Sequence, residues 1–184
     1  MHTSPSPDAL APAVLASFSH TFRSYKTLAD RALAQLTPTD WLYVPGPESN
    51  SIAVIVQHVT GNLRSRFSDF LTTDGEKPTR NRDQEFEQPA TVGTLPQAWE
   101  EGWQILFDVL DTLQPTDLLR TVYIRGEAHT VLAALQRQVA HYASHVGQIV
   151  QLAKQLRGTE WQTLSIARNQ SAAFNAAMQT RANQ

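Results

Sequence analysis

The sequence contains no cysteine among its 184 residues. This absence excludes disulfide bonds, zinc sites built on thiolates and a thiol of the protein as a nucleophile. Long apolar runs are also missing, because no stretch approaches the roughly 18 apolar residues of a membrane-spanning helix. The first residues lack the basic start and the apolar core of a secretory signal peptide. We therefore expect a cytoplasmic protein that does not associate with membranes.

An excess of positive charge is missing as well. The formal net charge is −2 and no basic stripe runs along the sequence, so we expect no nucleic-acid partner. Hydrophobic residues make up 41% of the chain and charged residues 17%, which is an ordinary globular composition. A chain of this length can bury enough apolar surface to form a core. We expect one domain over residues 1–184.

Four segments place apolar residues on one face at a period of about 100° per residue. They predict helices over residues 12–36, 51–72, 94–113 and 129–157. Thr94 is expected to open a capping box, Gly147 to allow close helix packing and Gly158 to end the last helix. Residues 118–126 are rich in β-branched side chains and fit either a short strand or a packed loop.

The two ends of the chain have weaker patterns. Residues 1–9 are rich in Ser and Pro and are expected to form a flexible tail. Residues 159–184 are expected to dock on the helices, with a helix over residues 165–180. The candidate docking residues are Ile166, Phe174 and Met178.

The helices predict an all-α protein with a four-helix bundle. Residues 73–93 join the second helix to the third, and so long a loop is uncommon in a compact domain. A helix of about 21 residues is about 31 Å long, whereas an extended connection of about that many residues reaches about 70 Å. The crossover can therefore span the bundle, which allows the second and third helices to run parallel. Its charges are mixed in sign, so we expect a solvated loop anchored by Phe86.

Two histidines lie four residues apart in "HYASH", within the last predicted helix. His141 and His145 are separated by about 40° around the helix, at the border of its apolar face. His58 occupies an equivalent border position on the second helix. Neutral imidazoles are good ligands for zinc, nickel, copper or iron, and residues at i and i+4 can share one ion.

This histidine pattern favours a metal site with an open coordination position, as catalytic zinc sites have. The motif lacks the glutamate of His-Glu-x-x-His, which argues against a metalloprotease. A pair at i and i+4 also arises by chance on helix surfaces, so a site without metal is the alternative. His20 is expected to be solvated, and His129 to lie in a helix cap.

Two further polar residues on the second helix are candidates for substrate binding. Asn62 lies about 40° from His58 around the helix. Arg66 could reach an anionic substrate, although a solvated arginine is the simpler interpretation.

Three stretches of the chain resemble the DinB/YfiT-like superfamily, and in particular a subfamily of uncharacterised bacterial proteins. They are "SIAVIVQHVTGNLRSRFSDFLTTDGEKPTRNRDQEF" (residues 51–86), "HTVLAALQRQVAHYASHVGQIVQLAK" (residues 129–154) and "WQTLSIARNQSAAFN" (residues 161–175). The resemblance implies a bundle with up-down-down-up connectivity and a homodimer. It also implies a divalent metal, zinc or nickel, held by His58, His141 and His145.

Relatives in this superfamily include transferases and isomerases that use bacillithiol, mycothiol or glutathione, in which the metal is thought to activate the thiol as thiolate. The resemblance therefore implies a bacillithiol-type S-transferase that acts on small electrophiles. The alternative is a stress-related helical bundle that binds metal without catalysis. The residues themselves leave open whether the protein is an enzyme.

Overall fold

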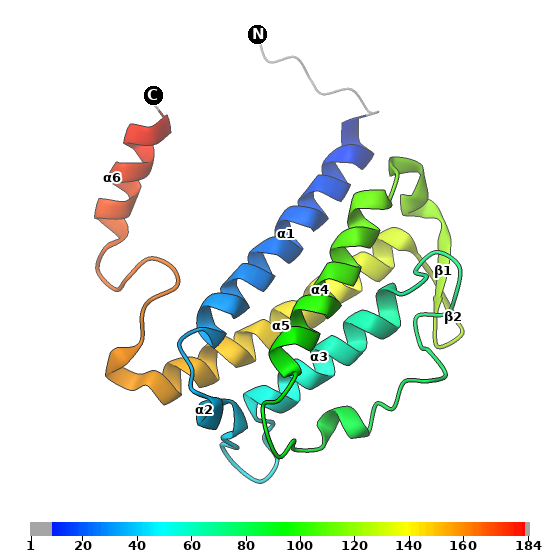
Figure 1. Cartoon of the computed structure of the whole chain (residues 1–184). Helices are drawn as coiled ribbons and strands as arrows, with labels where there is room; N and C mark the ends of the chain where they lie inside the picture. Colours follow the sequence, from blue (N-terminus) through cyan, green and yellow to red (C-terminus); the bar gives the residue numbers. More distant parts are fainter. Residues whose placement is uncertain (1–8, 183–184) are drawn as a thin grey trace.

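A computed structural model describes residues 9–182 of the chain. Four long helices dominate it (Figure 1). They are α1 (Leu10–Leu33), α3 (Ile52–Phe67), α4 (Leu95–Thr112) and α5 (Val131–Arg157). The shorter elements are α2 (Pro38–Leu42), η2 (Gln84–Phe86), η3 (Pro115–Leu119), β1 (Thr121–Ile124), β2 (Glu127–Thr130), η4 (Gly158–Glu160) and α6 (Ser171–Ala182). The helical class is thus confirmed. Residues 1–8 of the expected tail lie outside the described range.

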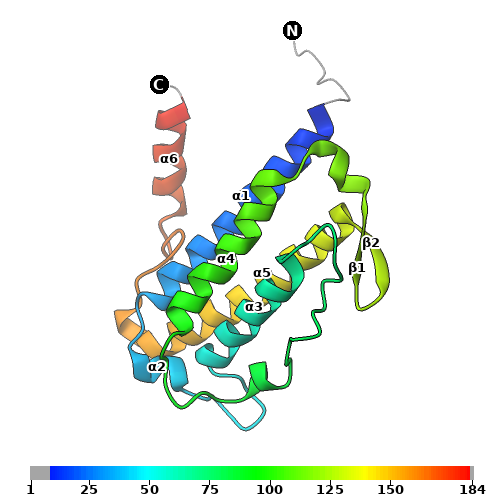
Figure 2. The same ribbon diagram turned by 45° about the vertical axis from the view of Figure 1, so that its right-hand side comes forward.

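The long helices pack as two pairs, α1 against α5 and α3 against α4. In both ribbon views, α3 and α4 run from the end beside α2 toward the opposite end of the bundle, whereas α1 and α5 run the other way (Figures 1 and 2). The crossover therefore returns along the length of the bundle. The largest fully buried side chains between the helices are Trp99, Trp103, Tyr142, Phe22 and Phe67. No helix of residues 9–182 has both the length and the apolar character to span a membrane.

Side-chain caps set the start of the two helices that carry the histidines. The Ser51 hydroxyl accepts a hydrogen bond from the Val54 amide at 3.2 Å, and the Thr130 hydroxyl accepts one from Ala133 at 3.1 Å. The expected capping box at Thr94 was wrong, because its side chain makes no cap hydrogen bond.

The expected end of the second helix near residue 72 was also wrong. The helix ends at Phe67, and Asp69 lies in the left-handed region with φ +50°. A residue in that conformation cannot continue a right-handed helix.

Residues 118–126, left open between strand and loop, contribute a strand. Strands β1 and β2 pair in an antiparallel hairpin in which Ile124 lies opposite Glu127. The turn residues Arg125 and Gly126 have φ values of +57° and +75°. Two positive φ values are the requirement of a type I′ turn. His129 therefore lies in a strand rather than in a helix cap.

Two expectations about packing were wrong. The docking residues Ile166, Phe174 and Met178 are 40%, 46% and 48% exposed, and α6 stands apart from the bundle in both views (Figures 1 and 2). A Cβ at Gly147 would meet no atom within 4 Å, so this glycine does not serve close packing. The close approach is at Gly102, where a Cβ would lie 3.3 Å from Cδ1 of Leu63 across the α3–α4 contact.

Candidate metal centre

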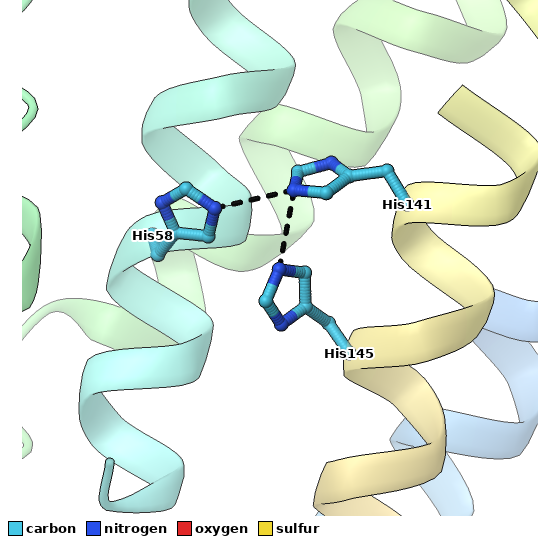
Figure 3. A group of neighbouring side chains, drawn as sticks. All are labelled: His58, His141 and His145. Carbon is cyan, nitrogen blue, oxygen red and sulfur yellow. Dashed lines mark hydrogen bonds between the residues drawn. The ribbon is translucent and has the colours of Figure 1, made fainter. Parts of the chain in front are cut away.

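Three imidazoles converge between α3 and α5 (Figure 3). Nε2 of His141 lies 3.2 Å from Nε2 of His58 and 3.1 Å from Nε2 of His145. All three residues offer a ring nitrogen within 4.8 Å of the others. The structure thus brings together the three residues proposed as ligands, although 83 positions separate His58 from His141.

The three Nε2 atoms that face one another cannot all be satisfied by hydrogen bonds among themselves. Nδ1 of His58 donates to a carboxylate of Glu85 at 2.9 Å, and Nδ1 of His145 donates to the amide oxygen of Gln148 at 2.8 Å. In a neutral imidazole the other nitrogen then carries a lone pair. With both rings neutral, both Nε2 atoms are acceptors, and His141 can supply a proton to only one of them. At least one lone pair is left unmatched, which is the condition that a bound cation resolves.

Burial favours the neutral form of His141 and His145. His58 is 4% exposed, and the other two side chains are half-buried. Desolvation, followed by the neighbouring His145 and His58, lowers the pKa of His141 to about 3. Desolvation also lowers the pKa of His145, against the opposing hydrogen bond that the ring donates to Gln148. Neutral imidazole is the form that binds metal.

The spacing of the nitrogens fits a first-row divalent ion. Zinc–nitrogen bonds of about 2.0–2.1 Å in a tetrahedral site place the ligand atoms about 3.3 Å apart. The two closest separations in the cluster are 3.1 Å and 3.2 Å. Within residues 9–182 the candidate group contains three histidines and no carboxylate. His58, His141 and His145 therefore form a group that could hold a divalent metal with an open coordination position.

Glu85 was not identified from the sequence, although it contacts a candidate ligand. It lies on η2 in the crossover, is 7% exposed and reaches His58 from the side of the ring opposite the other histidines. The expectation of a solvated loop is wrong for this part of residues 73–93. A signal was present in Gly61, a glycine inside a helix and three residues after His58. A Cβ there would lie 2.2 Å from Oε1 of Glu85.

Ion pairs continue from Glu85 along the crossover. Arg80 donates to both carboxylate oxygens of Glu85, at 2.7 Å and 2.8 Å. Glu76 lies 3.4 Å from Arg80 and 3.0 Å from Arg66. Desolvation raises the pKa of Glu85, but the hydrogen bonds from Arg80 and His58 outweigh it and leave that pKa lowered. The acid is therefore ionised at neutral pH.

The two candidate substrate-binding residues have partners within the protein. Arg66 is 5% exposed and donates to the Gly75 carbonyl as well as to Glu76, so it is not the solvated arginine that we expected. Asn62 is 5% exposed, and its Oδ1 accepts a hydrogen bond from the Tyr142 hydroxyl at 2.9 Å. Their role toward a substrate stays a prediction.

A groove of about 570 Å³ adjoins the cluster along α5. Gln148, which holds Nδ1 of His145, is part of its wall. Gly147 and Gln151 of α5 also line it, together with Pro45, Glu48, Ser49 and Asn50 of the connection before α3. The lining has no lysine, arginine or histidine, and Glu48 is its one charged residue.

Comparison with known sequences identifies a family but no function. A family model with the description "Protein of unknown function (DUF1572)" matches residues 10–170. Comparison with curated proteins found no significant match. Because the matched range spans both histidine-bearing helices and the crossover, the chain belongs to the family of proteins of unknown function DUF1572.

Proposed function

We propose that this protein is a metal-dependent S-transferase that joins a low-molecular-weight thiol, through its sulfur, to a small electrophile. The observation that carries the proposal is the convergence of three imidazoles with no fourth ligand from residues 9–182. The resemblance to DinB/YfiT-like proteins, whose four-helix topology we propose for the bundle, supports it further. The absence of cysteine is compatible with a thiol that comes from a small molecule.

The chemistry requires a thiolate at neutral pH. A divalent ion at the three histidines, zinc or nickel, would supply it by lowering the pKa of a thiol in the open position. The thiol proton leaves to solvent. The sulfur then attacks an electrophilic carbon, a carbon–sulfur bond forms, and the bond to a leaving group breaks with its electron pair. Burial favours the neutral, metal-binding form of His141 and His145.

The groove beside Gln148 is the proposed place for the rest of the thiol or its acceptor. Its volume lies in the range of about 300–1,000 Å³ that is usual for small-molecule sites. Amide and hydroxyl groups of Asn50, Ser144 and Gln151 can bind hydrogen-bonding groups of a ligand. Because Glu48 is the one charge in the lining, we propose an uncharged or cationic ligand group here rather than an anionic one.

Metal analysis of protein purified without a histidine tag tests the first step. We expect close to one equivalent of zinc or nickel per chain, and little metal in His141→Ala. A metal content of a few per cent in the wild type, unchanged in His141→Ala, would sink the proposal.

Loss of free thiol in the presence of alkyl halide or epoxide probes tests the second step. We expect metal-dependent consumption that disappears in the same variant. Equal rates in the wild type and in His141→Ala would contradict a catalytic site.

A further inference from the structure

We propose that Glu85 is a positioning residue of the metal centre, which holds His58 with its Nε2 lone pair directed at the other two imidazoles. Arg80 in turn holds Glu85 by hydrogen bonds, and Gly61 leaves room for its carboxylate. The inference rests on the proposed metal site and adds residues from the crossover to it. A carboxylate that accepts from the outer nitrogen of a metal-binding histidine fixes the tautomer and the orientation of the ring.

The contact with His58 has the geometry that this role requires. Oε2 of Glu85 lies 2.9 Å from Nδ1 of His58, and the two side chains are 9% and 5% exposed. Water therefore competes little for either partner. The ring of Phe86 lies 4.6 Å from the His58 ring, centroid to centroid, at an interplanar angle of 33°. Neighbouring residues of the crossover thus contact the edge and the face of the same imidazole.

Glu85 is fixed from its other side by Arg80. Nε and Nη2 of Arg80 donate to the two carboxylate oxygens at 2.7 Å and 2.8 Å, and the arginine side chain is 4% exposed. A bidentate pair of this kind restricts the carboxylate in both position and rotation. It also balances the negative charge, so that Glu85 remains an acceptor for the Nδ1 proton of His58.

The backbone of α3 makes room for this carboxylate. Gly61 lies one turn after His58, and a Cβ there would lie 2.2 Å from Oε1 and 2.7 Å from Cδ of Glu85. Both distances are below any ordinary contact between these atoms. The glycine carries a helix-propensity cost of about 1 kcal/mol relative to alanine. Three separate features, at positions 61, 80 and 86, therefore serve one contact.

Zinc affinity, measured by competition with a chromophoric chelator, tests the inference. We expect Glu85→Ala to bind zinc about 10- to 100-fold more weakly than the wild type, as loss of such a partner does elsewhere. Glu85→Gln keeps an acceptor oxygen and should lose less. Gly61→Ala leaves Glu85 in the sequence but displaces it, and should also weaken binding. The matched control is Glu101→Gln, which removes an exposed ion pair with Arg64 and should bind zinc as the wild type does.

The tautomer of His58 is the readout that a merely structural role would not change. In ¹⁵N NMR spectra of the metal-free protein we expect a protonated Nδ1 and an unprotonated Nε2. We expect a mixture of tautomers in Glu85→Ala, and in Gly61→Ala if the former does not fold. Variants with the wild-type tautomer and a zinc affinity within twofold of the wild type would overturn the inference. If the wild type binds no zinc while the tautomer changes as expected, the proposed function fails and the positioning of His58 by Glu85 stands.

Discussion

The Tyr142 hydroxyl donates a hydrogen bond to Oδ1 of Asn62 at 2.9 Å, between α5 and α3. Tyr142 follows His141 directly, and Asn62 lies one turn after His58. The bond therefore joins the two helices beside the point at which their histidines meet. Tyr142 has no exposed surface, and its ring packs 5.4 Å from that of Trp103. Tyr142 thus connects the aromatic core to the place where the histidines of the two helices meet.

Loss of this bond should lower stability. Tyr142→Phe removes the donor and leaves a buried amide oxygen without a partner, which costs about 1–3 kcal/mol of unfolding free energy. Urea unfolding followed by circular dichroism measures the change. Tyr25→Phe, in a partly buried tyrosine of α1, is the control and should change stability less. Equal stability of Tyr142→Phe and the wild type would show that the bond has no energetic role.

Removal of metal should lower the melting temperature without unfolding the bundle. None of the buried apolar residues of the core is a candidate metal ligand, so the helical signal at 25 °C should survive a chelator. Zinc at about 100 times its dissociation constant should add about 2.7 kcal/mol of stability through binding to the folded state. Thermal melts with zinc and with chelator measure this shift. His145→Ala should lose most of it, and a metal-free wild type that is unfolded at 25 °C would indicate a purely structural metal.

Alanine substitution of the two helix glycines at positions 147 and 102 should change the unfolding free energy differently. Gly147→Ala adds a methyl group where no atom lies within 4 Å, so we expect a gain of up to about 1 kcal/mol from helix propensity. Gly102→Ala brings its Cβ within 3.3 Å of Leu63 and should not show that gain. Equilibrium unfolding of both variants is the measurement. A larger gain for Gly102→Ala would contradict the packing described for α3 and α4.

A larger side chain at Gly147 tests whether the groove is the substrate site. Gly147→Phe places a large side chain in the groove that Gly147 lines, where an added Cβ meets no atom within 4 Å. We expect unchanged zinc affinity and at least a tenfold higher KM for the thiol or the acceptor. Gly147→Ala is the size control and should keep a KM near that of the wild type. Wild-type kinetics in Gly147→Phe would exclude the groove as the substrate site.

Asp74 should make stability depend on acidic pH. Desolvation raises its pKa, but hydrogen bonds from the amides of Glu76, Gly126 and Arg125 outweigh this and leave the pKa below its ordinary value of 3.8. A group with a lowered folded-state pKa stabilises the protein above its unfolded-state pKa. That contribution is lost as the pH falls through the folded-state pKa. The difference in unfolding free energy between the wild type and Asp74→Asn should therefore be largest near pH 6 and shrink by pH 3. A difference that is constant over this range would contradict the role of the Asp74 charge.

Sequence periodicity was sufficient to locate the helices and to single out the three histidines as candidate ligands, because both depend on local patterns. His141 and His145 are neighbours within one helix turn, and the border position of His58 follows from the apolar residues around it. Helix ends were less predictable, since the end of α3 depends on the backbone of Asp69. A hydrophobic pattern does not report that conformation.

The contact of Glu85 with His58 could not be predicted from periodicity. Glu85 lies in a connection without a repeating pattern, and its contact with His58 depends on how the crossover folds back over α3. One of several charges in "EKPTRNRDQEFE" had to be selected, and nothing local distinguishes it. Gly61 was the usable signal, because a glycine inside a helix beside a candidate ligand indicates that another group approaches the backbone there.

The histidines join the two helix pairs of the bundle. α1 packs mainly on α5 and α3 mainly on α4, whereas α3 and α5 contact each other less extensively. An ion held by His58 on α3 and by His141 and His145 on α5 would therefore cross-link the pairs at their weaker interface. If the pairs separate early during unfolding, such a cross-link slows the unfolding rate and leaves the folding rate nearly unchanged. The metal would then govern how long the folded protein persists more than how fast it forms.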